Sequence, residues 1–132
     1  MILVDTSGLF AVLDADDRNH ALASRYWRSA TAESLITHGY VVAETVSLVR
    51  TRMGWPAVDS LVDELMPRVR IEMIDRGLHD EALAEYRSVR GGTSFVDRVT
   101  IAFARRHRIR EAFAFDRNLV AAGLRFPGKE TA

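Results

Sequence analysis

The amino-acid sequence predicts an α/β fold in which a parallel sheet is covered by helices on both faces. Short apolar runs alternate along the chain with longer segments whose apolar residues recur at helical spacing. Runs such as Ile2–Val4 and Ala112–Phe115 are apolar at consecutive positions, which is typical of strands buried on both faces. No repeat, linker or low-complexity segment interrupts the pattern, so we expect a single domain over residues 1–132.

Five strands are expected, each beside residues that end a strand or begin a helix. The first ends in the polar segment 5–8, where a helix begins directly. His38 and Gly39 close the second, Pro67 precedes the third, and Asp116 follows the fourth at once. The expected strands cover residues 2–4, 34–37, 69–74, 112–115 and 124–126.

Apolar side chains four residues apart, together with glycine breaks and a proline, predict the helices. Leu22 and Tyr26 form such a pair. Gly54 ends a strongly apolar segment, and Pro56 suits the first turn of the helix that follows. The expected helices run up to Leu13, then over residues 19–30, 40–52, 56–66, 78–89 and 95–107, with a short last one up to about Ala122.

The charges sum to zero, but they are distributed unevenly along the chain. The sequence holds 17 Arg, one Lys and 18 acidic residues. Residues 1–86 carry 8 basic and 14 acidic side chains, whereas residues 87–132 carry 10 basic and 4 acidic. The neutral total argues against a nucleic-acid binder, whose footprint is usually basic, while the second segment favours one.

Composition excludes several classes of site. The absence of cysteine excludes a disulfide scaffold, a thiolate zinc site and a cysteine nucleophile. The apolar runs are too short to cross a bilayer, and Met1 leads into the first strand without a signal-like stretch. We therefore expect a cytoplasmic protein with no membrane partner.

Two acidic residues, Asp5 and Asp116, directly follow apolar strands. Ligands of open α/β sheets bind outside the carboxyl ends of the strands, so both carboxylates are expected at one crevice. Each also has a purely structural explanation, Asp5 as the N-cap of a helix and Asp116 as an Asx turn. The sequence leaves both explanations open.

Glu44 and Asp97 are the other candidate carboxylates. Glu44 lies between Val41 and Leu48 on an expected core-facing stripe, where an unpaired carboxylate is unfavourable. The alternative is that it sits at the edge of the stripe and reaches solvent or an arginine. Asp97 lies three residues after Ser94, which is also the spacing of a capping box.

Four carboxylates at one crevice indicate a divalent cation. Each close pair repels by about 4 kcal/mol at an intermediate dielectric. Mg²⁺ and Mn²⁺ prefer oxygen ligands, act on phosphate substrates and lower the pKa of a bound water. The histidines show no metal-ligand spacing, so each is expected at the surface or in a turn: His20, His38, His79 and His107.

The acidic residues lie in four motifs, which in chain order are Ile2–Ser7, Val42–Glu44, Ser94–Thr100 and Phe113–Asp116. Over nearly the whole chain, their order and spacing resemble the PIN domain and, within it, the VapC-type toxins of bacterial toxin–antitoxin pairs. The resemblance implies a three-layer α/β/α sandwich with a parallel sheet of four or five strands. It also implies an endoribonuclease that depends on Mg²⁺ or Mn²⁺.

The resemblance assigns roles by position in these motifs. Asp5 and Asp97 match the most direct metal ligands, while Glu44 and Asp116 complete the site, hold waters or bind a second metal. Supporting polar positions are matched by Thr6, Thr100 and Asn118. Leu119 departs from the pattern, because an aromatic residue is frequent there in the family.

The family also implies partners: an RNA substrate, a second copy of the chain in a homodimer, and a small antitoxin that fills a groove near the site. Leu22, Tyr26 and Trp27 are candidates to line that groove, with packing in the core as the alternative for each.

Arginine holds phosphates and stacks on unpaired bases, and we expect Arg90 and Arg98 to contact RNA. A further cluster stays unassigned, since cations also suit the end of a helix: Arg105, Arg106, Arg108 and Arg110.

Two other classes of function compete with a nuclease. A phosphotransfer or receiver domain needs a second aspartate two residues after the first, where Ser7 stands. A non-catalytic RNA- or protein-binding module on the same fold does not need the four acids. If those acids hold metal, 18 basic residues face 14 acidic ones, and RNA affinity should depend on divalent cation and fall with salt.

Overall fold

Four parallel strands form the sheet, in the spatial order β3, β2, β1, β4. They belong to a computed structural model that describes residues 1–127. β1 (Ile2–Val4) pairs with β2 (Leu35–His38) on one side and β4 (Glu111–Phe113) on the other, and β3 (Arg70–Glu72) pairs with β2. The first strand of the chain therefore lies between the second and the last.

Helices occupy most of the segments between the strands. They are α1 (Thr6–Leu13), α2 (His20–Ser29), α3 (Gly39–Met53), α4 (Trp55–Ser60), α5 (Arg76–Val89), α6 (Phe95–His107) and α7 (Arg117–Ala121). None of the helices described is long and apolar enough to cross a membrane. Short 3₁₀ turns at Ala32–Ser34 and Met66–Arg68 lead into β2 and β3.

The helix expected over residues 56–66 changes its hydrogen bonding along its length. It begins as α4, continues as a π-helical turn over Leu61–Leu65, and ends in the 3₁₀ turn that contains Pro67. Proline carries no backbone N–H, so a regular helix cannot continue through this position. The expected helix is present, but only its first part is α-helical.

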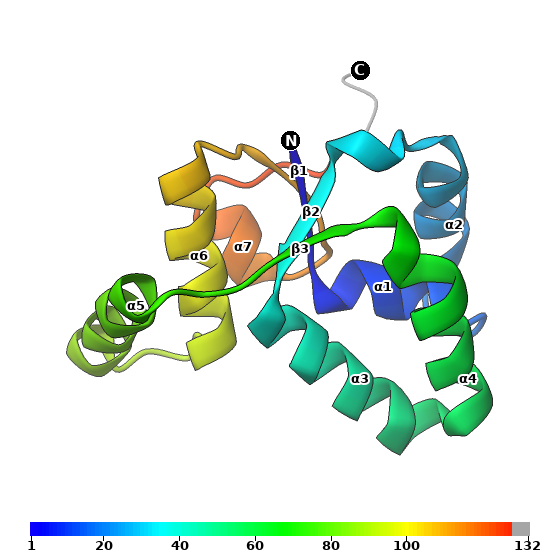
Figure 1. Ribbon diagram of the computed structural model, residues 1–132, viewed down its shortest axis with the longest axis horizontal. Helices are drawn as coiled ribbons and strands as arrows, with labels where there is room; N and C mark the ends of the chain where they lie inside the picture. Colours follow the sequence, from blue (N-terminus) through cyan, green and yellow to red (C-terminus); the bar gives the residue numbers. More distant parts are fainter. Residues whose placement is uncertain (128–132) are drawn as a thin grey trace.

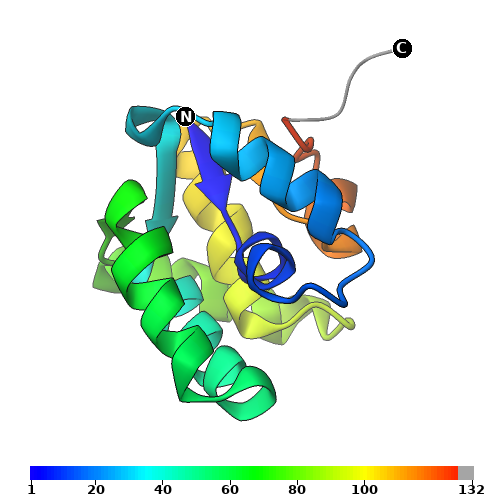
Figure 2. The same ribbon diagram turned by 90° about the vertical axis from the view of Figure 1, so that its right-hand side faces the viewer.

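Neighbouring residues in the strands face opposite helical layers. Leu3 and Ile36 belong to a buried cluster with residues of α5, α6 and α7. Val4 and Leu35, adjacent to them in the chain, belong to a second cluster with residues of α1, α2, α3 and α4. In Figure 1, α5, α6 and α7 lie on the left of the strands and α1, α2 and α4 on the right. Figure 2, turned by 90°, shows α6 behind β1.

This arrangement confirms the three-layer α/β/α sandwich and explains the consecutive apolar residues of its strands. The expected fifth strand, residues 124–126, is a single parallel bridge between Glu111 and Arg125. The third is shorter than expected, because only Arg70–Glu72 pair with β2. Both shortened strands lie at the edges of the sheet.

The aromatic residues of α2 are part of the core. Trp27 is 6% exposed and its ring lies 5.6 Å from that of Phe113. Tyr26 is half-buried and packs on Phe113 and Phe126, and Leu22 is half-buried too. The core alternative therefore holds for Trp27, and Tyr26 packs against the same core with part of its surface exposed.

Candidate active site

A cleft of about 270 Å³ opens at the carboxyl ends of β1 and β4. All four acidic residues singled out in the sequence line it, although they come from separate parts of the chain. The full lining is Asp5, Thr6, Ser7, Phe10, Asp17, Asn19, Glu44, Leu48, Arg52, Asp97, Phe115 and Asp116. The fold thus brings together what sequence order alone keeps far apart.

Asp5 both caps a helix and faces the cleft. Its carboxylate accepts hydrogen bonds from the backbone N–H of Ser7 at 3.1 Å and the hydroxyl of Ser7 at 2.8 Å, at the N-terminus of α1. The side chain is 3% exposed. Burial raises the pKa of Asp5, the bonds from Ser7 oppose this, and repulsion from Asp116 and Glu44 adds to it.

The start of α1 packs closely against β4 because Gly8 has no side chain. A Cβ added at Gly8 would lie 2.3 Å from the carbonyl oxygen of Phe113. No other residue type fits this approach without displacing the backbone. Next to it, the hydroxyl of Ser7 accepts the backbone N–H of Phe115 at 2.9 Å. These contacts fix the position of Asp5 relative to the segment that carries Asp116.

Asp97 lies in the first turn of α6 and is 8% exposed. Burial raises its pKa to about 6, repulsion from Asp116 and Asp5 contributes, and hydrogen bonding from the Asn118 side chain acts in the opposite direction. The Ser94 hydroxyl accepts its backbone N–H at 3.1 Å. Only this half of a capping box forms in the described chain, which leaves the Asp97 carboxylate to the cleft.

Glu44 reaches the cleft from α3, where Leu48 and Arg52 line the same wall at successive intervals of four residues. The buried stripe of this helix is formed by Val41, Thr45 and Val49. Glu44 is half-buried beside this stripe and not on it. The expected core-facing stripe was therefore wrong in its orientation around the helix, and the alternative of a position at its edge is correct.

Asp116 caps α7, accepting the backbone N–H of Asn118 at 2.7 Å. It is half-buried and lines the cleft. The capping explanations for Asp5 and Asp116 are therefore correct, and they coexist with a place in the site.

The three supporting residues occupy different positions. Thr6 lines the cleft and shares a hydrogen bond of 2.8 Å with the hydroxyl of Thr45. Thr100 is fully buried, one turn along α6 from Asp97, and is bonded to His38 at 2.9 Å. Asn118 is exposed on α7.

The expectation that His38 lies at the surface is wrong, because the side chain is buried and forms hydrogen bonds through both ring nitrogens. It is completely buried at the end of β2, where its Nδ1 accepts the backbone N–H groups of Tyr40 and Val41 and so caps α3. The proton must then sit on Nε2, which donates to Thr100. Burial lowers the pKa of His38 to about 4. Its ring therefore joins the helix that carries Glu44 to the helix that carries Asp97.

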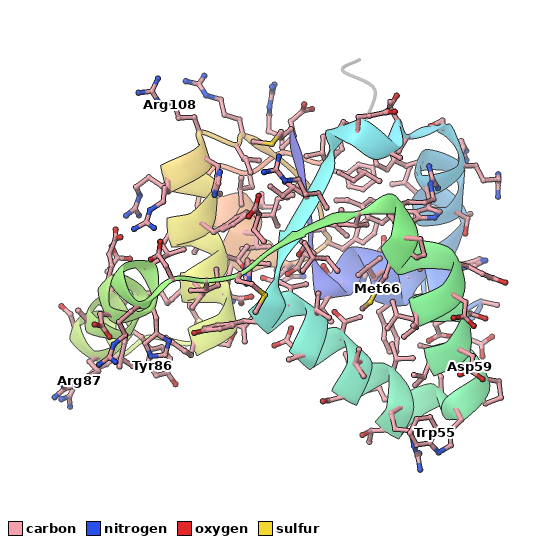
Figure 3. The ribbon with its side chains drawn as sticks, viewed as in Figure 1. Trp55, Asp59, Met66, Tyr86, Arg87 and Arg108 are labelled. Carbon is pink, nitrogen blue, oxygen red and sulfur yellow. The ribbon has the colours of Figure 1, made fainter. Side chains whose placement is uncertain are left out.

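Neither arginine expected to contact RNA lines this cleft. Arg90 ends α5 with a left-handed φ of 52° and borders a separate hollow with Tyr86, Arg87 and Gly91. Figure 3 shows Tyr86 and Arg87 together on that helix. Arg98 is half-buried on α6, next to Asp97 in sequence.

Two arginines of the cluster at the end of α6 have a structural role. Arg105 pairs with Glu85 at 3.1 Å and Arg106 with Asp75 at 2.9 Å, which ties α6 to α5 and the loop before it. Arg108 ends α6, about 16 Å along the helix from Asp97 (Figure 3). The cluster therefore lies away from the cleft.

Five further lining residues had no signal in the sequence: Phe10, Asp17, Asn19, Arg52 and Phe115. They come from the end of α1, the loop after it, the end of α3 and the segment after β4. Only the packing of these elements reveals them.

The donor set fits a hard divalent cation in its chemistry. The acidic wall offers carboxylate oxygens, with no sulfur and no histidine, and two of these carboxyls have raised pKa values. As the side chains lie, no three His, Asp or Glu residues within 1–127 are close enough to enclose an ion. Binding a cation would therefore draw the carboxylates inward.

The family of this chain follows from its similarity to known proteins. The family model of the PIN domain matches residues 2–123. This chain belongs to the PIN-domain family. The 23S rRNA-specific endonuclease VapC20 of Mycobacterium tuberculosis is 35% identical over 126 residues, which are 94% of this chain and 95% of that protein. Ribonuclease VapC26 of the same species is 31% identical over 92% of this chain and 90% of its own length.

Solved structures agree with this PIN-domain assignment. The crystal structure of M. tuberculosis VapC20, described as a sarcin-ricin loop cleaving toxin, superposes with a TM-score of 0.82 and 32% identity over 94% of this chain and 96% of that one. FitAcB from Neisseria gonorrhoeae superposes with a TM-score of 0.72 over 97% and 98% of the two chains; at 18% identity it supports the fold alone. The expected VapC-type endoribonuclease family is confirmed.

Proposed function

We propose that this protein is the toxin of a toxin–antitoxin pair and cleaves RNA in the cleft, with Mg²⁺ or Mn²⁺ as cofactor. One observation carries the proposal: Asp5, Glu44, Asp97 and Asp116, which come from four separate segments, line one cleft in a PIN domain. A phosphotransfer domain does not account for Glu44 and Asp97 in the same wall.

The four side chains divide by burial. Asp5 and Asp97 are the most buried and repel each other, so they are the residues we assign to hold the cation. Glu44 and Asp116 are half-buried, where they can orient water at the rim. A bound divalent cation offsets the repulsion and favours attack of water on a phosphodiester. We assign supporting roles to three polar residues: Asn118, whose side chain bonds to Asp97, Thr6, which follows Asp5 and bonds to Thr45 of α3, and Thr100, which bonds to His38 one turn after Asp97.

Cleavage by the purified protein tests this assignment. We expect RNA to be cut with Mg²⁺ or Mn²⁺ and not with a chelator, leaving 5′-phosphate and 3′-hydroxyl ends. Asp5→Asn and Asp97→Asn should each lower the rate by at least about 100-fold, because each removes a charged oxygen ligand. Asp59→Asn, which changes an exposed carboxylate on α4 (Figure 3), is the matched control and should cleave normally.

Two results contradict the proposal. Undiminished cleavage by both cleft variants places the chemistry elsewhere. Products with 2′,3′-cyclic phosphates show attack by the ribose hydroxyl in place of water.

We further propose that the substrate is a structured loop of ribosomal RNA. The support is the likeness to VapC20, whose names give 23S rRNA and the sarcin-ricin loop as its target. Mapping RNA ends after induction should then show one dominant cut in 23S rRNA. Cuts spread over messenger or transfer RNA contradict this substrate.

We also propose that residues 1–132 act as one domain in a cytoplasmic homodimer, that an antitoxin binds near the cleft, and that Arg90 and Arg98 contact RNA. Arg90 borders its own hollow with Tyr86 and Arg87, so its contact would be with RNA that extends beyond the cleft. Sedimentation of the purified chain, alone and with the product of a neighbouring small gene, tests the assembly.

A further inference from the structure

One basic side chain lines the cleft together with its acidic residues. Arg52, in the last turn of α3, is the one basic side chain in the lining formed by the described residues. Its guanidinium carbon lies 5.6 Å from the ring centre of Phe10 on α1, which lines the cleft too. Arg52 is exposed and takes part in none of the ion pairs formed within residues 1–127. Its charge therefore remains available to a ligand.

Distance along α3 separates Arg52 from Glu44. Arg52 follows Glu44 by two turns, or about 12 Å of helix, and Leu48 lies between them on the same wall. Because two turns of helix lie between the two backbone positions, we take the phosphate held by Arg52 to be a neighbour of the one at the carboxylates. Leu48 lies between these positions on α3, and the ring of Phe10 lies against the Arg52 guanidinium in the same cleft.

We propose that Arg52 and Phe10 form a subsite for RNA next to the site of cleavage. Arg52 binds a phosphate that is not cut, and Phe10 with Leu48 supports the nucleoside between the two phosphates. Guanidinium groups suit phosphate geometry, and aromatic rings accept any base by stacking. The inference rests on the proposed function, and it adds to that function a determinant of RNA affinity.

A structural role for Arg52 makes a different prediction, and α3 supplies the control. Arg50 also lies in the last turn of α3, so it has the same favourable position at the negative end of the helix dipole. It also stacks on an aromatic ring, with its guanidinium carbon 4.6 Å from the ring centre of Trp55. Arg50 does not line the cleft. If Arg52 only stabilises the helix, the two arginines should behave alike.

The test compares Arg52→Gln with Arg50→Gln in RNA binding and in cleavage. Fluorescence anisotropy with a labelled RNA oligonucleotide in chelator measures binding without cleavage. We expect Arg52→Gln to bind about five- to tenfold more weakly and to lower the slope of log affinity against log salt by about 0.7, as for one lost contact to a single strand. Arg52→Lys should keep the slope and recover part of the affinity. Arg50→Gln should stay within about twofold of the wild type.

Cleavage kinetics with Mg²⁺ complete the test. Arg52→Gln should raise KM and leave kcat within about twofold, because the contact is the same in the ground and transition states. Equal affinities and salt slopes for the two glutamine variants overturn the subsite. Failure of the wild type to cleave any RNA overturns the proposed function, and the anisotropy comparison distinguishes that result from failure of the subsite.

Discussion

The hydroxyl of Ser7 donates a hydrogen bond of 2.8 Å to the carboxylate of Asp5 and at the same time accepts the backbone N–H of Phe115 at 2.9 Å. One small side chain thus connects the residue after β1 with the segment after β4. Because Asp116 follows Phe115 directly, Ser7 sets the spacing between two of the four carboxylates.

Ser7→Ala should lower the cleavage rate by about tenfold at pH 6 and by less at pH 8. The lost bond favoured the charged form of Asp5, so the pKa of Asp5 rises further and a larger fraction is protonated at low pH. The pH–rate profile measures this as a shift of the acid limb to higher pH. Ser47→Ala, at an exposed position of α3, should leave the profile in place. A uniform loss at all pH values would show that Ser7 acts on geometry alone.

Asp97→Asn should stabilise the protein in chelator by about 2–3 kcal/mol at pH 7.5. The pKa of Asp97 is raised from 3.8 to about 6, so the folded state holds a proton that the unfolded state releases between these values. The contribution of Asp97 to the stability of the wild type therefore falls as pH rises from about 4 to 6, and the amide removes this loss. Urea unfolding at several pH values measures the difference, which should vanish near pH 4.

A divalent cation should make the wild type more stable than Asp97→Asn, which is the reverse of the order expected in chelator. Mg²⁺ or Mn²⁺ stabilises whichever chain binds it, so the wild type should gain stability on titration and Asp97→Asn should gain little. Equal gains for both proteins would count against Asp97 as a ligand.

His38→Asn should remove a pH dependence of the opposite sign. The pKa of His38 is lowered from 6.5 to about 4, so between these values the unfolded state binds a proton that the folded state does not. The contribution of His38 to stability is lost as pH falls through this window, by about 2–3 kcal/mol. Asparagine can still cap α3 but does not titrate. In a denaturation series from pH 4 to 7, the difference in stability between His38→Asn and the wild type should therefore move in favour of the variant as pH falls, and a difference that does not depend on pH would refute the assignment.

Gly8→Ala should destabilise the protein by about 2–4 kcal/mol and reduce cleavage even where the variant remains folded. The new Cβ would overlap the carbonyl oxygen of Phe113 and push α1, with Asp5, away from β4. Gly77→Ala is the control, because its Cβ would meet its nearest atom at 3.4 Å within a helix that favours alanine. Thermal unfolding and the cleavage rate distinguish the two variants.

The order of strands, helices and acidic residues was predictable because each depends on local sequence. Asp5 and Asp116 follow apolar strands, and a parallel sheet brings such positions to one edge. The same local reasoning failed for His38, whose burial depends on α6 packing over β2. It also failed for Arg52 and Phe10, which meet only because α3 passes α1.

Charge was the least predictable property. Arg105 and Arg106 make the C-terminal segment look basic, yet acidic groups on and before α5 neutralise them across the helix interface. Sequence position does not reveal such pairing, because Glu85 and Arg105 are twenty residues apart. The basic surplus of residues 87–132 is therefore smaller at the surface than in the sequence.

The pairing of β1 with β4 sets the time at which this chain can become a nuclease during its own synthesis. β1 is made first, but its partner on one side and the last of the four carboxylates are encoded in residues 111–116. Until that segment has been synthesised, the cleft lacks Asp116 opposite Asp5, and the Ser7 hydroxyl lacks the backbone N–H of Phe115 that it accepts. We therefore expect a nascent or truncated chain that stops before β4 not to cleave RNA, because the cleft lined by Asp5 and Asp116 forms only when β4 pairs with β1.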